Sequence, residues 1–270
     1  MKIYTLSIGQ GQFAVVVGAT EAIIVDTCIS NAATINVKGA LANILGGKNL
    51  VGLMITGFDA DHFNEMGISI VLNKYRPDWI MYPRYFKESK AANAGFLAIN
   101  KFSNAKDVTR VSVDLDDNNK RLYNSLTKDF TVEVFSPHKE DMDSSNNSSL
   151  VCKITERATG ASYLVTGDTE GSRWDSIVRI FGNNLKSDVL DAPHHGSKNG
   201  ITKGALALIK PHTVLISAGI DNAYGHPDAE AIALYRNYAN QVYSTNWGDG
   251  GQSLLTTTDS NGVKSVKFTY

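Results

Sequence analysis

The chain has 270 residues, and its 26 Lys and Arg residues nearly balance 27 Asp and Glu residues, which gives a formal net charge of −1. With 43 % hydrophobic and 20 % charged residues it can form a large core, and this excludes disordered, collagen-like and coiled-coil chains. The near-zero charge argues against a polybasic, histone-like binder but says nothing about local basic patches. Two cysteines, Cys28 and Cys152, are too few for a disulfide framework and form no C-x-x-C pair, so they indicate a reducing compartment.

Apolar runs in the sequence are short. None approaches the roughly 20 consecutive apolar residues that cross a bilayer. The first six residues run directly into strand-like sequence, without the apolar stretch of a secretory signal. We therefore expect a cytoplasmic protein with no membrane association, and no pattern in the sequence addresses its oligomeric state.

Apolar runs of strand length alternate with stretches of helical periodicity. The predicted strands are residues 2–8, 13–17, 22–26, 52–55, 132–135, 150–155, 162–166, 189–191, 213–217, 252–256 and 263–268. The predicted helices are residues 32–45, 62–75, 171–181, 202–209 and 227–238. Strand pairs at both ends with helices between them predict two sheets packed face to face, with the helices outside.

The middle of the chain, residues 84–128, breaks this rhythm and is expected to form an insertion or cap. Within residues 74–110, eight basic residues stand against three acidic ones, with seven aromatic residues interleaved. Basic groups neutralise phosphates and aromatic rings stack on bases, so this stretch is a candidate surface for single-stranded nucleic acid. An amphipathic helix with buried rings and solvated lysines explains the same pattern, and we favour that interpretation.

The densest polar cluster is T-G-F-D-A-D-H, residues 56–62, which joins an apolar run to a helical pattern. Asp59, Asp61 and His62 are three potential metal ligands within four residues of a strand-to-helix loop. A helix N-terminus at this point stabilises carboxylates. An ordinary helix cap, with Asp61 capping and His62 exposed, is the alternative, and the loop alone does not separate the two.

Four further polar clusters follow apolar runs or precede helices, and they contain Asp168, the pair His194 and His195, His226, and the polar run 146–149. Each has a plain alternative as a turn aspartate, a pair of loop histidines, a helix cap or a polar turn. Together with the loop 56–62 they hold four of the six histidines, so the clustering predicts a metal site. Oxygen and imidazole ligands suit Zn²⁺ or Mn²⁺ rather than Ca²⁺.

The order of these motifs resembles the metallo-β-lactamase fold, and within it the ComEC-like branch, the nuclease-like domain of DNA-uptake proteins. The matching segments span nearly the whole chain and are residues 7–12 (S-I-G-Q-G-Q), 24–27 (I-V-D-T), 59–62 (D-A-D-H), 147–150 (N-S-S-L), 166–168 (T-G-D), 191–197 (D-A-P-H-H-G-S) and 224–227 (Y-G-H-P). The resemblance implies an α/β, four-layer αββα sandwich formed by a single domain over residues 1–270.

The resemblance also implies functional roles. It predicts a better-preserved metal site that consists of Asp61, His62, Asp168 and His226. Asp59 would belong to a second metal, and His194 or His195 would lie beside the scissile group as a metal ligand, phosphate contact or proton donor. Asp61, His194 and His195 are therefore the expected catalytic residues. One or two Zn²⁺ or Mn²⁺ ions would polarise a phosphoryl group and activate water.

Three positions depart from the pattern of the family. Gly57 stands where members usually have a histidine ligand, Gln12 where an aspartate is usual, and Cys28 where glycine is common. The better-preserved site is therefore expected to be intact, whereas the other metal site has lost a ligand.

These observations predict a metal-dependent hydrolase of phosphodiester bonds, with nucleic acid or a nucleotide as substrate. One alternative is an ester, lactone or thioester hydrolase on the same fold, for which an apolar closed pocket would be expected. The other is a binding or regulatory module that has lost hydrolysis, which the glycine at position 57 favours.

Overall fold

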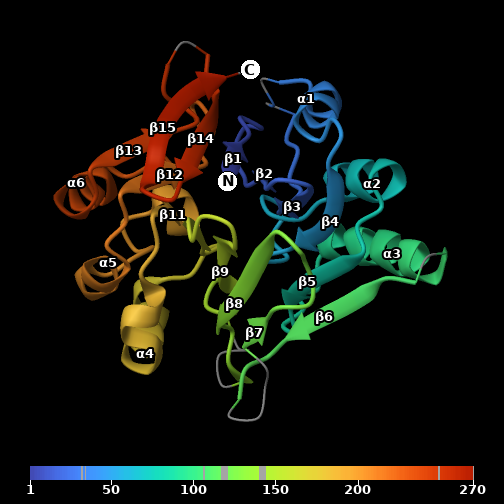
Figure 1. Ribbon diagram of the computed structural model, residues 1–270, viewed down its shortest axis with the longest axis horizontal. Coiled ribbons are helices and arrows are strands. Elements are labelled where there is room, and N and C mark those ends of the chain that lie inside the picture. The colour runs from blue at the N-terminus through green and yellow to red at the C-terminus, as the bar shows by residue number, and fades with distance from the viewer. Residues whose placement is uncertain are drawn as a thin grey trace.

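Figure 1 shows a computed structural model, which describes residues 1–31, 33, 35–105, 107–116, 121–139, 144–248 and 250–269. Two sheets lie in the middle of the molecule, with helices α1, α2 and α3 outside one of them and α4, α5 and α6 outside the other. The four layers therefore follow the predicted αββα order, and the α/β fold class is confirmed.

The first sheet has eight strands. In spatial order they are β15 (Gly262–Thr269), β14 (Ser253–Asp259), β1 (Lys2–Thr5), β2 (Ala14–Val17), β3 (Glu21–Val25), β4 (Asn49–Met54), β5 (Trp79–Pro83) and β6 (Thr109–Val113). Strands β15 to β3 pair antiparallel, and β3 to β6 pair parallel.

The second sheet has seven strands, β13 (Gln241–Ser244), β12 (Thr213–Ile216), β11 (Val189–Asp191), β10 (Ser162–Val165), β9 (Val151–Glu156), β8 (Phe130–Ser136) and β7 (Leu122–Tyr123). Its β10, β11, β12 and β13 run parallel.

The helices are α1 (Val37–Ile44), α2 (Glu65–Lys74), α3 (Lys90–Ala105), α4 (Gly171–Phe181), α5 (Lys203–Ile209) and α6 (Ala229–Tyr238), with short 3-10 turns η2 (Gly182–Leu185) and η3 (Pro193–Gly196). Helices α1 and α2 begin later than predicted because Asn36 and Asn64 accept hydrogen bonds from the backbone N–H groups of Gly39 and Gly67. Within the described ranges, every helix is too short or too polar to cross a membrane.

The core follows the alternation of side chains along the strands. In β3, Ile23 and Val25 face the second sheet, whereas Ala22 and Ile24 pack with the helices α1 to α3. Both faces of this strand are therefore buried, as expected for a strand between two covered layers.

The segment expected to form an insertion or cap, residues 84–128, contributes α3, β6 and β7, so it lies at one end of each sheet. Within it, Phe102 is buried and Phe96 packs against Phe58 and Phe63, and Trp79 in the preceding strand β5 is buried as well. The rings therefore do not form an exposed stacking track, which agrees with the favoured interpretation. The boundaries of the domain stay a prediction.

The parallel strands of both sheets end at the same edge of the sandwich. The loop after β4 lies next to the segments that follow β3, β10 and β11, as hydrogen bonds among their residues show. Loops at the carboxyl ends of parallel strands form the usual ligand site of such sheets. This edge contains the candidate site.

Candidate metal centre

The loop between β4 and α2 is fixed by a buried carboxylate. Asp26, directly after β3, accepts hydrogen bonds from the backbone N–H of Thr56 (2.7 Å) and from its hydroxyl (2.5 Å). The Nδ1 atom of His62 lies 2.8 Å from the same carboxylate. Asp26 has a left-handed φ of 56°, a strained conformation that is compensated by these three contacts. The orientation of the His62 ring is thus set by a neighbouring strand end.

The other ring nitrogen of His62 faces Asp168, which follows β10. The Nε2 atom lies 2.8 Å from Asp168 Oδ1, and the Ser149 hydroxyl accepts a hydrogen bond from the Asp168 backbone N–H. Although burial favours the neutral ring, the Asp168 and Asp26 carboxylates raise the pKa of His62 well above its usual value. The two flanking carboxylates therefore favour the protonated form of the His62 ring.

His195 enters the same cluster from η3. Its φ is 54° and that of His194 is 51°, so the chain turns sharply here and directs the His195 ring inward. Its Nδ1 atom donates a hydrogen bond of 2.8 Å to the carbonyl of Ser217, at the end of β12. Its Nε2 atom lies 3.5 Å from Asp61 Oδ2 and 3.7 Å from Asp168 Oδ1, and has no hydrogen-bond partner within the described chain.

The donor atoms of Asp61, His62, Asp168 and His195 all lie within 4.8 Å of one another, and three of these four residues are buried. A buried imidazole nitrogen without a partner, facing two carboxylates, is what a cation would satisfy. The residues therefore fit one divalent metal ion. The cluster contains three of the four residues predicted for the better-preserved metal site, with His195 as its fourth member.

His226 lies in the wall of the same cavity, outside the four-residue cluster. Its ring centroid is 5.7 Å from that of His194, and its Nδ1 atom is 3.8 Å from an Asp228 carboxylate oxygen. Tyr224 stacks on His226 with an angle of 14° between the rings, and its own side chain is exposed. His194 Nδ1 lies 3.5 Å from Glu170 Oε1. The predicted metal role of His226 stays a prediction.

Asp59, predicted for a second metal, has a different environment. Lys87 pairs with its Oδ1 atom and the Ser145 hydroxyl donates to its Oδ2 atom. The hydrogen bond to Asp59 raises the pKa of Lys87, which therefore stays an ammonium. Gly57 provides no side chain, and a Cβ atom built on it has no atom within 4 Å.

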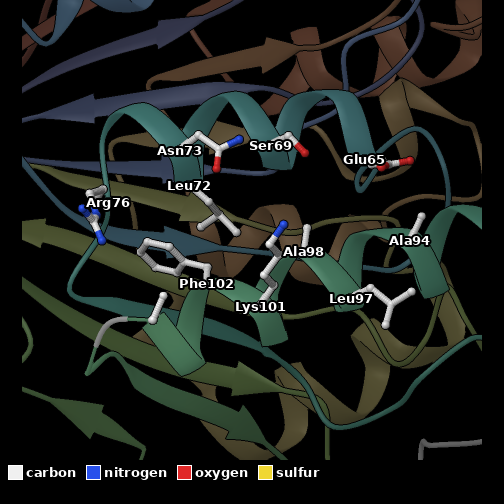
Figure 2. Close-up of a pocket in the computed structure, with 11 residues that line it drawn as sticks. Glu65, Ser69, Leu72, Asn73, Arg76, Ala94, Leu97, Ala98, Lys101 and Phe102 are labelled. Carbon is white, nitrogen blue, oxygen red and sulfur yellow. The ribbon is translucent and has the colours of Figure 1, made fainter.

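The cavity above the cluster measures about 550 Å³, and its lining includes the polar side chains of Asp59, Asp61, Asp168, His194, His195 and His226. A second cavity of about 570 Å³ lies between α2 and α3 (Figure 2). Leu72 and Phe102 lie beside it with Arg76 and Lys101, and Glu65 is its one carboxylate. It contains no histidine, so the smaller cavity is the candidate active site.

Two supporting residues did not enter the predicted site. Gln12 donates its side-chain amide to both oxygens of the buried Asp191, at distances of 3.2 and 3.0 Å, and its backbone N–H binds the carbonyl of Asp61. Burial raises the pKa of Asp191 to about 7. Gln12 and Asp191 stand in matched segments of the sequence, but their pairing joins residues 179 positions apart.

Comparison with known sequences supports the motif order. Over 205 residues the chain is 30 % identical to ComE operon protein 3 of Bacillus subtilis (strain 168), a match that covers 74 % of this chain and 24 % of that protein. Over 127 residues it is 32 % identical to competence protein ComA of Neisseria gonorrhoeae, covering 44 % of this chain and 18 % of that protein. The chain thus spans a quarter or less of the length of these relatives. No family model matches the chain.

Solved structures share its architecture. Igni18, a novel metallo hydrolase from the hyperthermophilic archaeon Ignicoccus hospitalis KIN4/I, superposes with a TM-score of 0.57 at 12 % identity, over 96 % of this chain and 100 % of that one. CmlA, a diiron beta-hydroxylase from Streptomyces venezuelae, gives a TM-score of 0.55 at 13 % identity, over 89 % of this chain and 52 % of that one. At such identities the likeness is one of fold.

The layer order and these likenesses show that the chain is an α/β protein with the metallo-β-lactamase fold. Within that fold, its similarity to ComE operon protein 3 and ComA shows that it is ComEC-like, which confirms the resemblance predicted from the order of motifs.

Proposed function

We propose that the chain is a metal-dependent phosphodiesterase that acts on nucleic acid or a nucleotide. The observation that carries this proposal is the convergence of Asp61, His62, Asp168 and His195 beside an open cavity. A divalent ion held by these residues, with Zn²⁺ or Mn²⁺ best suited to the donor set, supplies Lewis acidity and a water nucleophile at neutral pH. Similarity to competence proteins supports nucleic acid as the substrate class.

His194 and His195 differ in the roles that their surroundings suit. His195 donates through Nδ1 to Ser217 and turns Nε2 toward the carboxylates, which suits a ligand. His194 is more exposed and lies at the cavity mouth near Glu170, which suits a phosphate contact or a proton donor to the leaving group. We therefore assign the two roles that the sequence left open to different histidines.

The cavity wall also bears on the alternative substrates. Carboxylates and imidazoles share its lining with apolar surface, but the cavity is open rather than closed, which is not the pocket expected for a small acyl substrate. Among the described lining residues there is also no lysine or arginine. The lining carboxylates alone would repel a phosphate, so we expect chelation to abolish substrate binding as well as turnover.

The test is a substrate panel with the metal-depleted protein, reloaded separately with Zn²⁺ or Mn²⁺. The panel contains single- and double-stranded DNA, RNA, cyclic nucleotides, and an ester, a lactone and a thioester. We expect weak metal-stimulated phosphodiester cleavage that falls steeply in His195→Ala, whereas His212→Ala, which is remote from the cavity, retains it. Cleavage of only the acyl substrates, or metal binding without any cleavage, would reject the proposal in favour of the acyl hydrolase or the binding module, respectively.

A further inference from the structure

The carboxylate of Asp59 already has partners for both oxygens. Oδ1 pairs with the ammonium of Lys87 and Oδ2 accepts from the hydroxyl of Ser145. The main-chain carbonyl of Asp59 is also engaged, because it accepts from the N–H groups of His62 (3.0 Å) and Phe63 (2.9 Å). A metal ion at Asp59 would therefore have to displace a cation that is already bound.

The surroundings of Asp59 offer little else to a metal. Gly57, two residues earlier, provides no ligand atom. Across the part of the chain that the structure describes, the only group of three or more close His, Cys, Asp or Glu donors is the one that contains Asp61 and His62. Protein sites for divalent transition metals normally need three or more such ligands. A second metal site does not fit the residues present.

Lys87 is held in place by its neighbour. Phe86 packs its ring at 5.5 Å from that of Phe58 and at 4.8 Å from that of Phe96. Phe58 is itself the residue between Gly57 and Asp59, so the same aromatic contacts fix both the lysine loop and the metal loop. The pairing of Lys87 with Asp59 is thus built into the packing of two loops and is more than a chance contact between surface charges.

We infer that the ammonium of Lys87 takes the place of a second metal ion, so that the cavity holds a single divalent ion. The charges agree with this: one divalent ion and one ammonium balance the carboxylates of Asp59, Asp61 and Asp168. Lys87 also neutralises Asp59, a lining carboxylate that would otherwise repel an anionic substrate. This inference rests on the metal site of the proposed function.

The test measures the number of bound ions rather than activity. Metal-free protein is dialysed against Mn²⁺, bound metal is measured by elemental analysis, and pairs of nearby ions are detected by their spin coupling in electron paramagnetic resonance. We expect one ion per chain for the parent and Lys87→Met, and Gly57→His/Lys87→Arg should bind a second ion no better than Gly57→His alone. Gly57→His/Lys87→Met should bind a second ion, coupled to the first but held more weakly, because it adds a ligand and removes the competing cation. Gly57→His alone should bind the second ion about fivefold more weakly than that double variant, since Lys87 still competes.

Lys90→Met is the matched control, because Lys90 is an exposed lysine three positions along the same segment. It should leave the stoichiometry of both Gly57→His and the parent unchanged. Two coupled ions in the parent would overturn the inference while leaving the metal-dependent function in place. Equal affinity for the second ion in Gly57→His with and without Lys87 would overturn it too. A parent that binds no ion would overturn both this inference and the proposed function.

Discussion

The two ends of the loop between β4 and α2 differ in what surrounds them. At the Asp61–His62 end, the side chains join a cluster that Asp26 and Ser217 orient from two other strand ends. At the Gly57–Asp59 end, one carboxylate is neutralised by a lysine and, among the described residues, belongs to no group of three or more close metal donors. The comparison teaches that a metal site depends on the groups that orient the ligands as much as on the ligands themselves.

The largest expected effect comes from removing the carboxylate at the supported end. Asp61→Ala should abolish metal-stimulated phosphodiester cleavage and lower metal occupancy sharply, because it deletes one of four converging donors. Elemental analysis and a cleavage assay check both. Asp59→Ala is the matched change at the other end, and we expect it to retain the bound ion. If Asp59→Ala loses the ion as completely as Asp61→Ala, the difference between the two ends disappears.

A second prediction concerns how the stability of the fold depends on pH through the buried carboxyl group of Asp191. Asp191 has a pKa of about 7 in the folded protein because of burial, against 3.8 for an ordinary aspartate. Between pH 4 and 7 the unfolded chain releases this proton while the folded chain keeps it, so stability falls as the pH rises. The loss approaches about 4 kcal/mol.

Asp191→Asn should remove that fall, and denaturant unfolding of metal-free protein at a series of pH values measures it. Asp175→Asn, an exposed change on α4, should keep the slope of the parent. An unchanged slope in Asp191→Asn would show that another group is responsible for the pH dependence.

The third prediction tests whether Asp26 orients His62 for metal binding. Asp26→Asn should weaken metal binding by about 10- to 100-fold, because it removes the carboxylate that orients His62 through Nδ1. Isothermal titration with Zn²⁺ gives the affinity. Asp129→Asn serves as control, since Asp129 also accepts backbone N–H groups, those of Thr20 and Glu21, but far from the cluster. Equal affinities in the two variants would remove the role assigned to Asp26.

The smallest effect is expected at the open rim. Tyr224 exposes 68 % of its surface beside the cavity, so its free face can stack on a base. Tyr224→Ala should raise KM for single-stranded nucleic acid about fivefold, while Tyr224→Phe keeps it. Phe268→Ala, an exposed ring on β15, controls for the loss of a surface aromatic. A KM that is unchanged in Tyr224→Ala would argue against stacking there.

Sequence patterns predicted much of this arrangement because each ligand loop directly follows a short apolar run. Asp61, His62 and Asp168 come together in the structure as the motif order implied. The sequence could not decide between His194 and His195, because the choice depends on two consecutive left-handed residues that turn one ring inward. It also could not reveal Lys87 as the partner of Asp59, since that contact depends on how an aromatic loop packs. Helix α3 and strands β6 and β7 lie where the sequence suggested an insertion, and neither they nor β5, just before it, were predicted individually.

The hydrogen bond from His195 to Ser217 has a consequence for how the site can change over time. Its acceptor is a main-chain carbonyl at the end of β12, so no side-chain replacement at position 217 deletes it. His62, by contrast, takes its orientation from the side chain of Asp26, which a single point mutation can remove. The two imidazoles of one cluster therefore differ in their tolerance of sequence drift: one is anchored to the backbone itself, and the other lasts only as long as one carboxylate is kept.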